Sequence, residues 1–364
     1  MKKKFSITPI DKWFDNKGKR PLIIAGPCSA ESFEQVYQTA KELSDIPQVT
    51  VFRAGVWKPR TNPDDYKGAG KKALSWLQQI KKDFNLYTAV EVLSPAHVEA
   101  CLSHDIDILW LGARTVSNPY SVQLLAESLK GTNAIVLVKN PLNPDIKLWL
   151  GAIERINNSG IHNIAAVHRG FFPFESTKLR NIPKWELVID LRTLHPEIPV
   201  ICDPSHIAGN TKYISAIAQK AMDLCYDGLM IESHIHPSEA LSDAQQQVTP
   251  ATLKKIIHTL SYNYNVINDI EHLELLKLRE QVDSIDSQLI ELLSFRMNIV
   301  KQMAEYKQQH KIPILQLRRW HEIMTSRIKQ AENLQLNTSF VKSLLEIIHL
   351  EALRILSDEH NKNL

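Results

Sequence analysis

The sequence predicts an α/β fold, a (β/α)8 barrel, followed by an all-helical domain of three helices that dimerises. We expect the barrel to span residues 1–262, a linker to occupy 263–270 and the helical domain to span 271–364. The first observation is a repeat of eight short apolar runs, each followed by a polar or glycine-containing turn and a helical stretch. The second is their spacing, because eight such units in about 240 residues match the usual size of this barrel. The third is that glycine disappears after residue 271 and helix-forming residues dominate.

The eight apolar runs are the predicted strands of the barrel. Unbroken apolar runs of this length are typical of parallel strands that are buried on both faces. They lie at residues 22–24, 50–52, 87–90, 108–111, 135–138, 164–167, 200–202 and 229–231. A doubly wound open sheet has the same alternation of strand and helix, so the pattern alone leaves that fold as the alternative.

Composition excludes several classes of protein. A net charge of +3 over 364 residues gives no reason to expect nucleic acid or an anionic membrane as a partner. No stretch approaches the roughly 18 uninterrupted apolar residues of a membrane span, and the basic residues 2–4 are not followed by the apolar core of a signal peptide. The cysteines are scattered and lack CxxC spacing: Cys28, Cys101, Cys202 and Cys225. We therefore expect a cytoplasmic protein in which a functional cysteine is a ligand or nucleophile.

The region after residue 271 contains three predicted helices. Apolar residues keep helical spacing from Leu278 to Met303, so the first helix is long for a globular protein. Pro313 marks a break because proline removes a backbone donor. A second helix then runs to about residue 333, and a third from about residue 339 to 356. Such helices cannot bury their apolar faces alone, so we expect a homodimer, with larger assemblies also open.

Polar or ionisable side chains follow every predicted strand, at the end where the active site of such a barrel lies. Six of them are cations: Arg53, Lys58, Arg60, Arg114, Lys139 and Arg169. So many cations at one mouth are costly unless an anion binds there, and the guanidinium fork matches phosphate and carboxylate oxygens. A pair of substrates that carries two phosphates and a carboxylate would satisfy them.

A metal site can be assembled at the same mouth. Cys28, His206 and Glu232 follow the first, seventh and eighth strands, which are neighbours once the barrel closes, and Asp243 lies in the next loop. One sulfur, one imidazole and two carboxylates suit Mn, Fe, Co or Zn better than Mg. Taken singly, a buried cysteine is more often inert packing and a loop carboxylate more often solvated surface. The four together predict one divalent metal ion.

Seven motifs occur in order along the barrel. They are Gly26-Pro27-Cys28-Ser29, Phe52-Arg53-Ala54-Gly55, Lys58-Pro59-Arg60-Thr61, Gly112-Ala113-Arg114, Leu137-Val138-Lys139, His168-Arg169-Gly170 and Asp203-Pro204-Ser205-His206. Over residues 20–262 the chain resembles 3-deoxy-arabino-heptulosonate 7-phosphate (DAHP) synthase in its short form. The resemblance implies the first step of the shikimate pathway, in which phosphoenolpyruvate condenses with erythrose 4-phosphate and phosphate is released.

The resemblance also implies roles for the matching residues. The metal would be held by Cys28, His206, Glu232 and Asp243. Phosphoenolpyruvate would be held by Arg53, Arg114, Lys139 and Arg169, and the aldose phosphate by Arg60 and Thr61. The predicted catalytic residues are Lys58, in proton transfer, with Asp203 and His206. Glu91 and Ala113, at the ends of the third and fourth strands, complete the predicted substrate site.

A second enzyme family is the nearest alternative for the barrel. 3-Deoxy-manno-octulosonate 8-phosphate synthase resembles the same region but uses arabinose 5-phosphate. The segment Lys58-Pro59-Arg60-Thr61 and the helical region after residue 271 argue against it.

Basic residues on the predicted helices indicate an anion pocket. Arg296 and Lys307 lie about 20° apart around a helix, whereas Arg279 lies about 100° from Arg296. Arg279 could therefore reach the pocket of a partner chain, and Arg319 in the second helix could close it. Ordinary solvated arginines on a coiled-coil face are the alternative interpretation.

Further motifs connect the helical region with a known family. Leu278-Arg279-Glu280 and Ala304-Glu305-Tyr306-Lys307 resemble the all-helical class of chorismate mutase, an intertwined dimer, over residues 271 to about 358. The resemblance implies that Arg279, Arg296, Lys307 and Arg319 bind chorismate or prephenate. Four positions depart from the family's Asp, Glu, Ser and Gln: Gln316, Trp320, Ala352 and Leu356. Since one lost donor commonly costs about 10²–10³ in rate, two hypotheses remain: a mutase, or a weak or inactive mutase that serves as a regulatory and dimerisation module.

Overall fold

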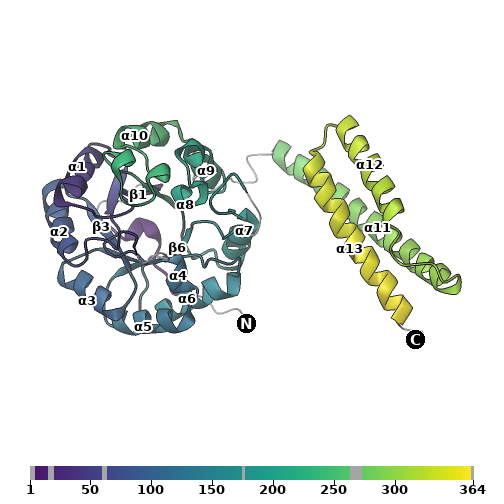
Figure 1. Cartoon of the computed structure of the whole chain (residues 1–364), viewed down its shortest axis with the longest axis horizontal. Helices are drawn as coiled ribbons and strands as arrows, with labels where there is room; N and C mark the ends of the chain where they lie inside the picture. Colours follow the sequence, from purple (N-terminus) through teal and green to yellow (C-terminus); the bar gives the residue numbers. More distant parts are fainter. Residues whose placement is uncertain (1–4, 15–19, 60–63, 174–176, 263–272, 362–364) are drawn as a thin grey trace. The chain divides into compact units, whose positions relative to one another are not determined.

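The computed structural model describes residues 5–14, 20–59, 64–173, 177–262 and 273–361, and Figure 1 shows their arrangement. The chain forms two compact units, residues 1–264 and 265–364. Arg60 and Thr61, which the sequence predicts to bind the aldose phosphate, lie outside the described residues. No helix within the described ranges is both long and apolar enough to cross a membrane.

The first unit is a closed barrel of eight parallel strands in sequence order (Figure 1), which confirms the predicted barrel and excludes the open sheet. The strands are β1 (Leu22–Gly26), β2 (Val49–Arg53), β3 (Tyr87–Val92), β4 (Ile108–Leu111), β5 (Ile135–Lys139), β6 (Ile164–His168), β7 (Val200–Cys202) and β8 (Gly228–Glu232). The barrel closes where β1 pairs with β8, from Leu22 opposite Gly228 to Gly26 opposite Glu232.

Helices surround the barrel as a ring (Figure 1). They are α1 (Phe33–Ser44), α2 (Lys72–Phe84), α3 (Pro95–Ser103), α5 (Pro119–Leu129), α6 (Ile146–Asn158), α7 (Trp185–Leu194), α9 (Thr211–Asp223) and α10 (Pro250–Thr259), and the short helices α4 (Ala113–Val116) and α8 (Pro204–Ala208) lie inside this ring. Three short 3-10 helices are η1 (Ile10–Lys12), η2 (Pro237–Glu239) and η3 (Ala244–Gln246). Side chains such as Ser32, Ser94 and Asp145 begin their helices by accepting a backbone N–H of the first turn.

Burial on both faces of the strands explains the unbroken apolar runs. Ile24, Val51 and Leu137 belong to the core inside the barrel, whereas Ile23 and Val138 belong to the core between strands and helices. At the carboxyl ends of the strands, buried polar side chains replace the apolar ones. The barrel therefore carries its chemistry at one rim and its packing everywhere else.

The second unit consists of α11 (Leu273–Gln309), α12 (Leu317–Asn333) and α13 (Thr338–Asn361), the three helices that the sequence predicts. A small core between α11 and α13 is formed by Val300, Ala304, Ala352, Ile355 and Leu356. The first half of α11 is different, because four apolar side chains along it are more than half exposed in the single chain. These are Leu278, Val282, Ile285 and Leu289.

Candidate active site

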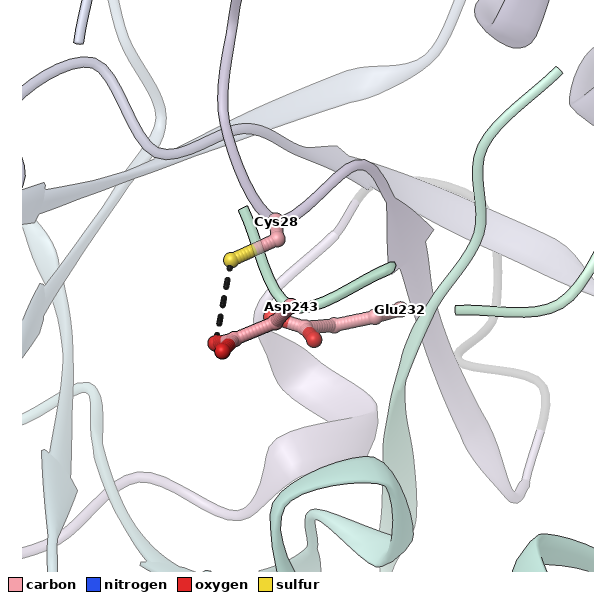
Figure 2. Close-up of side chains that lie close together, drawn as sticks. All are labelled: Cys28, Glu232 and Asp243. Atoms are coloured by element: carbon pink, nitrogen blue, oxygen red, sulfur yellow. Dashed lines mark hydrogen bonds between the residues drawn. The ribbon is translucent and has the colours of Figure 1, made fainter. Parts of the chain in front are cut away.

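Three of the four predicted metal ligands lie together at the carboxyl end of the barrel. Cys28 follows β1, Glu232 is the last residue of β8, and Asp243 directly precedes η3. One ligand atom of each lies within 4.8 Å of the other two, and Cys28 Sγ is 3.5 Å from Asp243 Oδ2 (Figure 2). Residues more than 200 positions apart thus meet because β1 and β8 are paired.

The fourth predicted ligand, His206, lies beside this cluster in α8. Its Nε2 is 3.8 Å from Glu232 Oε1, and its Nδ1 is 2.8 Å from Asp203 Oδ2. Burial lowers the pKa of His206, which favours the neutral imidazole that metals bind. Burial alone would raise the pKa of Asp203, but His206 and then Lys139 outweigh it and hold that pKa well below its usual range. Asp203 therefore remains ionised and orients the imidazole.

The donor set fits a divalent transition metal. Thiolate sulfur, imidazole nitrogen and carboxylate oxygen are all ligands of such ions. Glu232 Oε1 is buried and accepts no hydrogen bond from the residues described, although a guanidinium nitrogen of Arg53 lies 3.2 Å away. Burial, followed by the charge of Glu232, raises the pKa of Cys28 to about 11. A thiol in these surroundings needs a bound cation to ionise near neutral pH, so the residues fit a metal ion.

Two buried cations on the barrel's inner rim lie close to this cluster. Arg53, at the end of β2, contacts Glu232, and its Nε and NH1 are buried with no hydrogen-bond partner within the described ranges. Lys139, at the end of β5, lies 2.7 Å from Asp203 Oδ2. Unsatisfied guanidinium donors in a dry site favour an incoming carboxylate or phosphate.

Arg169, directly after β6, is the third buried cation. It donates a hydrogen bond to Asn181 Oδ1 at 2.8 Å. Burial lowers its pKa to about 10; Arg180 and Arg114 add to the shift, whereas Asp203 opposes it. An anion bound among these cations would relieve their mutual repulsion.

Asp243 of the cluster, together with His206 and several cations, lines a cleft of about 330 Å³. Of the predicted site residues, the cleft is lined by Lys58, Glu91, Ala113, Arg114, Lys139, Arg169, His206 and Asp243. A Cβ at Gly112 would lie 1.9 Å from Glu91 Oε1, so this glycine leaves room for the carboxylate. Arg114 donates to the backbone oxygen of Pro59 at 3.1 Å, which connects it to the segment that carries Lys58.

Lys58 lies between the metal cluster and the cleft. Its Nζ donates to Cys28 Sγ at 3.0 Å. A Cβ at Gly55 would lie 2.7 Å from that Nζ, so the glycine makes room for the ammonium group. This position suits a group that exchanges a proton with a substrate bound in the cleft.

Sequence reasoning missed several polar residues around the cluster. Arg180, in the loop between β6 and α7, lies 3.0 Å from Asp243 Oδ1 and lines the cleft. Asn181 joins Arg169 to the backbone oxygen of His206. The sequence gives little indication of these two residues, because they lie far along the loop rather than at a strand end. Burial tends to raise the pKa of Asp243, but Arg180 first, and then His206, lower it to about 2.

In the helical unit, the predicted cations come from two helices. Arg279, Arg296 and Lys307 belong to α11, and Arg319 belongs to α12. Lys307 Nζ donates to the backbone oxygens of Pro313 and Ile314, at 3.2 and 2.7 Å, and burial lowers its pKa. Arg319 donates to Glu322 at 3.4 Å.

Three of the four positions that depart from the mutase pattern have packing roles, whereas Gln316 is exposed just before α12. Trp320 stacks on His349 with ring centroids 3.9 Å apart. Ala352 and Leu356 are buried in the small core between α11 and α13. Apolar packing therefore occupies three positions where the related family offers polar side chains.

Comparison with known proteins agrees with this division of the chain. Residues 4–266 match the DAHP synthetase I family, and residues 278–355 match chorismate mutase type II. The phospho-2-dehydro-3-deoxyheptonate aldolase of Thermotoga maritima is 31% identical over 238 residues, 65% of this chain and 68% of that protein. A 2-dehydro-3-deoxyphosphooctonate aldolase of Wolinella succinogenes is 27% identical over 263 residues, 66% of this chain and 97% of that protein.

A solved structure of a DAHP synthase also resembles this chain. The crystal structure of the Thermotoga maritima DAHP synthase has a TM-score of 0.60 at 31% identity and covers 65% of this chain and 67% of its own. The first family match spans every strand of the barrel, and the second lies within the helical unit. The chain therefore belongs to the DAHP synthetase I family of enzymes and carries a chorismate mutase type II domain.

Proposed function

We propose that the barrel condenses phosphoenolpyruvate with erythrose 4-phosphate in a metal-dependent reaction that yields DAHP and phosphate. The observation that supports it best is one cleft lined by cations and by Asp243, whose carboxylate is clustered with Cys28 and Glu232. The two substrates carry two phosphates and a carboxylate, which matches the charge of this mouth. A Wolinella succinogenes relative is named for octulosonate chemistry, so an assay with both aldoses decides between the two reactions.

Cys28, His206, Glu232 and Asp243 would hold one Mn, Fe, Co or Zn ion. When bound, such an ion supplies Lewis-acid polarisation of the aldehyde oxygen. Asp203 keeps the imidazole of His206 oriented toward Glu232.

The cations of the cleft would position the substrates. Arg53, Arg114, Lys139 and Arg169 would hold phosphoenolpyruvate, and Lys58 would move a proton at its Nζ. Glu91 and Ala113 would form part of the wall around the reacting groups. Arg60 and Thr61, outside the described residues, stay proposed ligands of the aldose phosphate. Fixing two reactants in this way can lower the barrier by several kcal/mol.

For the helical unit, we propose binding of chorismate or prephenate by Arg279, Arg296, Lys307 and Arg319. Conversion of chorismate to prephenate is one possible outcome. A weak or inactive mutase that regulates the barrel is the alternative, which Ala352 and Leu356 favour because neither side chain can donate a hydrogen bond. Coupling between two binding sites is reciprocal. If a ligand of this domain changes the affinity of the barrel for its substrates, those substrates must change the affinity of this domain for its ligand by the same factor.

We further propose that α11 pairs with α11 of a second copy. The exposed apolar residues of its first half form a face too large to leave in water. Pairing would also allow Arg279 to reach the partner's pocket, as its angle around the helix suggests.

The metal site is tested by Cys28→Ala. We expect loss of both bound metal and condensation, because the soft ligand of the site is gone, with the circular dichroism spectrum unchanged. Cys225→Ala, at an exposed cysteine, is the matched control and should retain both. Full activity of metal-free Cys28→Ala would refute the metal site.

The cationic cleft is tested by Arg114→Ala. We expect the KM for phosphoenolpyruvate to rise about tenfold or more, because a charge-assisted hydrogen bond is lost. Arg155→Ala removes an arginine on α6 that donates to Gly151, and it should leave KM unchanged. Equal KM values for wild type and Arg114→Ala would place the anion elsewhere.

Ligand binding by the helical unit is tested by calorimetric titration of the full chain with prephenate. We expect Arg296→Met to weaken binding about tenfold or more. Arg354→Met, at an exposed arginine paired with Glu351 and Asp358, is the control. Assays of chorismate conversion and of condensation with added prephenate then separate mutase from regulator. No heat of binding by the wild type would reduce the domain to a dimerisation device.

The paired α11 face is tested by Leu289→Glu in sedimentation velocity. We expect the wild type to sediment as a dimer or larger species and the variant to shift toward 41.5 kDa, because a buried carboxylate lacks a partner. Gln288→Glu adds the same charge at the next position, off the apolar face, and should not dissociate the dimer. A dimer that survives Leu289→Glu would contradict the proposed interface.

A further inference from the structure

We propose that the adjacent residues Gln246 and Gln247 are positioning residues that hold the metal ligands Cys28, Glu232 and Asp243 in their binding geometry. The inference rests on the proposed metal site. Both glutamines are buried, at 2% and 1% exposure, although neither reaches the substrate cleft as a lining residue.

Gln246 connects the two carboxylates of the site. Its Nε2 donates to Glu232 Oε2 at 2.7 Å and lies 3.4 Å from Asp243 Oδ2. Its Oε1 accepts from Arg180 at 2.6 Å. A donor that faces two carboxylates and an acceptor that faces a guanidinium fix the orientation of the amide. The amide thereby holds Glu232 through one oxygen and leaves the other, Oε1, available to a metal ion.

Gln247 connects the backbone segments that carry Cys28 and Asp243. Its Oε1 accepts from the backbone N–H of Cys28 at 2.8 Å, and its Nε2 donates to the backbone oxygen of Ser242 at 2.8 Å. The loop after β1 and the loop before η3 are thus joined through one side chain. This connection fixes the distance between the segment that carries the sulfur ligand and the segment that carries the carboxylate ligand.

The conformation of Asp243 shows why such support is needed. Its φ of +48° and ψ of 38° lie in the left-handed region, which is unfavourable for a residue with a Cβ. Such a conformation persists where surrounding contacts determine it. Arg180 holds Asp243 Oδ1 at 3.0 Å, so Oδ2 is the oxygen that faces Cys28 and Gln246.

Both glutamines are neutral, which makes the inference testable without electrostatic ambiguity. Replacement by leucine changes no charge, supplies no new metal ligand and keeps a side chain of similar size. A change in metal affinity then reports on the geometry of the ligands. If the glutamines only fill space, the leucine variants should bind metal as the wild type does.

The experiment compares full-length wild type, Gln246→Leu, Gln247→Leu and a control, Gln219→Leu. Gln219 lies on α9 and makes hydrogen bonds of the same kind, to Asp223 and Ser261. The Kd for Mn²⁺ is measured by chelator competition without substrates, and the thiolate-to-Co²⁺ charge-transfer band reports bonding to Cys28. Thermal unfolding of the metal-free proteins shows whether each variant is folded.

We expect Gln246→Leu and Gln247→Leu to raise the Kd about 10- to 100-fold and to weaken the charge-transfer band, with Gln219→Leu unchanged. Folded variants with a wild-type Kd and band would overturn the inference. If one variant does not fold, the other is judged by the same criterion. Failure of the proposed metal site looks different, because the wild type itself would then bind no metal or Cys28→Ala would bind it equally well.

Discussion

Closure of the barrel between β1 and β8 is the constraint on which the active site depends. The register sets Gly26 opposite Glu232, so Cys28, two residues further on, is carried to the side of that carboxylate. Gly26 is required for this approach: its φ is +147°, and a Cβ there would lie 2.1 Å from the backbone oxygen of Arg53. The proposed metal site, assembled from distant segments, would therefore be a consequence of strand pairing, and any slip of register would separate its residues.

Balanced charge is the second requirement, because buried ions are costly unless they are paired. Two such pairs are buried, Arg53 with Glu232 at 3.2 Å and Lys139 with Asp203 at 2.7 Å, and a third, Arg180 with Asp243 at 3.0 Å, is partly exposed. In each pair, a cation that could bind a substrate anion contacts an acidic residue. That acidic residue lies in the proposed metal cluster or beside it. A metal ion and an anionic substrate would therefore enter a site in which part of the charge is already paired, while the remaining cations would be neutralised by the substrate.

Residues at strand ends could be predicted from the sequence, because a parallel barrel delivers every strand to the same rim. The eight strands, and the presence of Glu232, Arg53 and Lys139 at one rim, follow from that rule, whereas Asp243 lies in the loop after β8, to which the rule does not extend, and is indicated by the resemblance. Arg180, Asn181 and Gln246 could not be predicted, because their positions depend on how two long loops fold over the rim. His168 is an exception to this rule, because it lies at a strand end but not in the candidate site. Although it ends β6, its ring is buried between Tyr226 and the backbone oxygen of Pro183, and burial lowers its pKa to about 4.

The helical unit differs from the barrel in its packing. Its core within a single chain is small, and much of its exposed apolar surface is on α11. Within that core, Ala352 and Leu356 pack near Val300 and Ala304, where a polar side chain would need a hydrogen-bond partner. A bound ligand can provide such a partner in a mutase, but apolar residues stabilise the helices without one. Alanine and leucine at these positions thus pack in the core and donate no hydrogen bond. Under the proposed function, binding of a dicarboxylate would rest on the cations of α11 and α12, whereas conversion would need neutral donors that Ala352 and Leu356 do not supply.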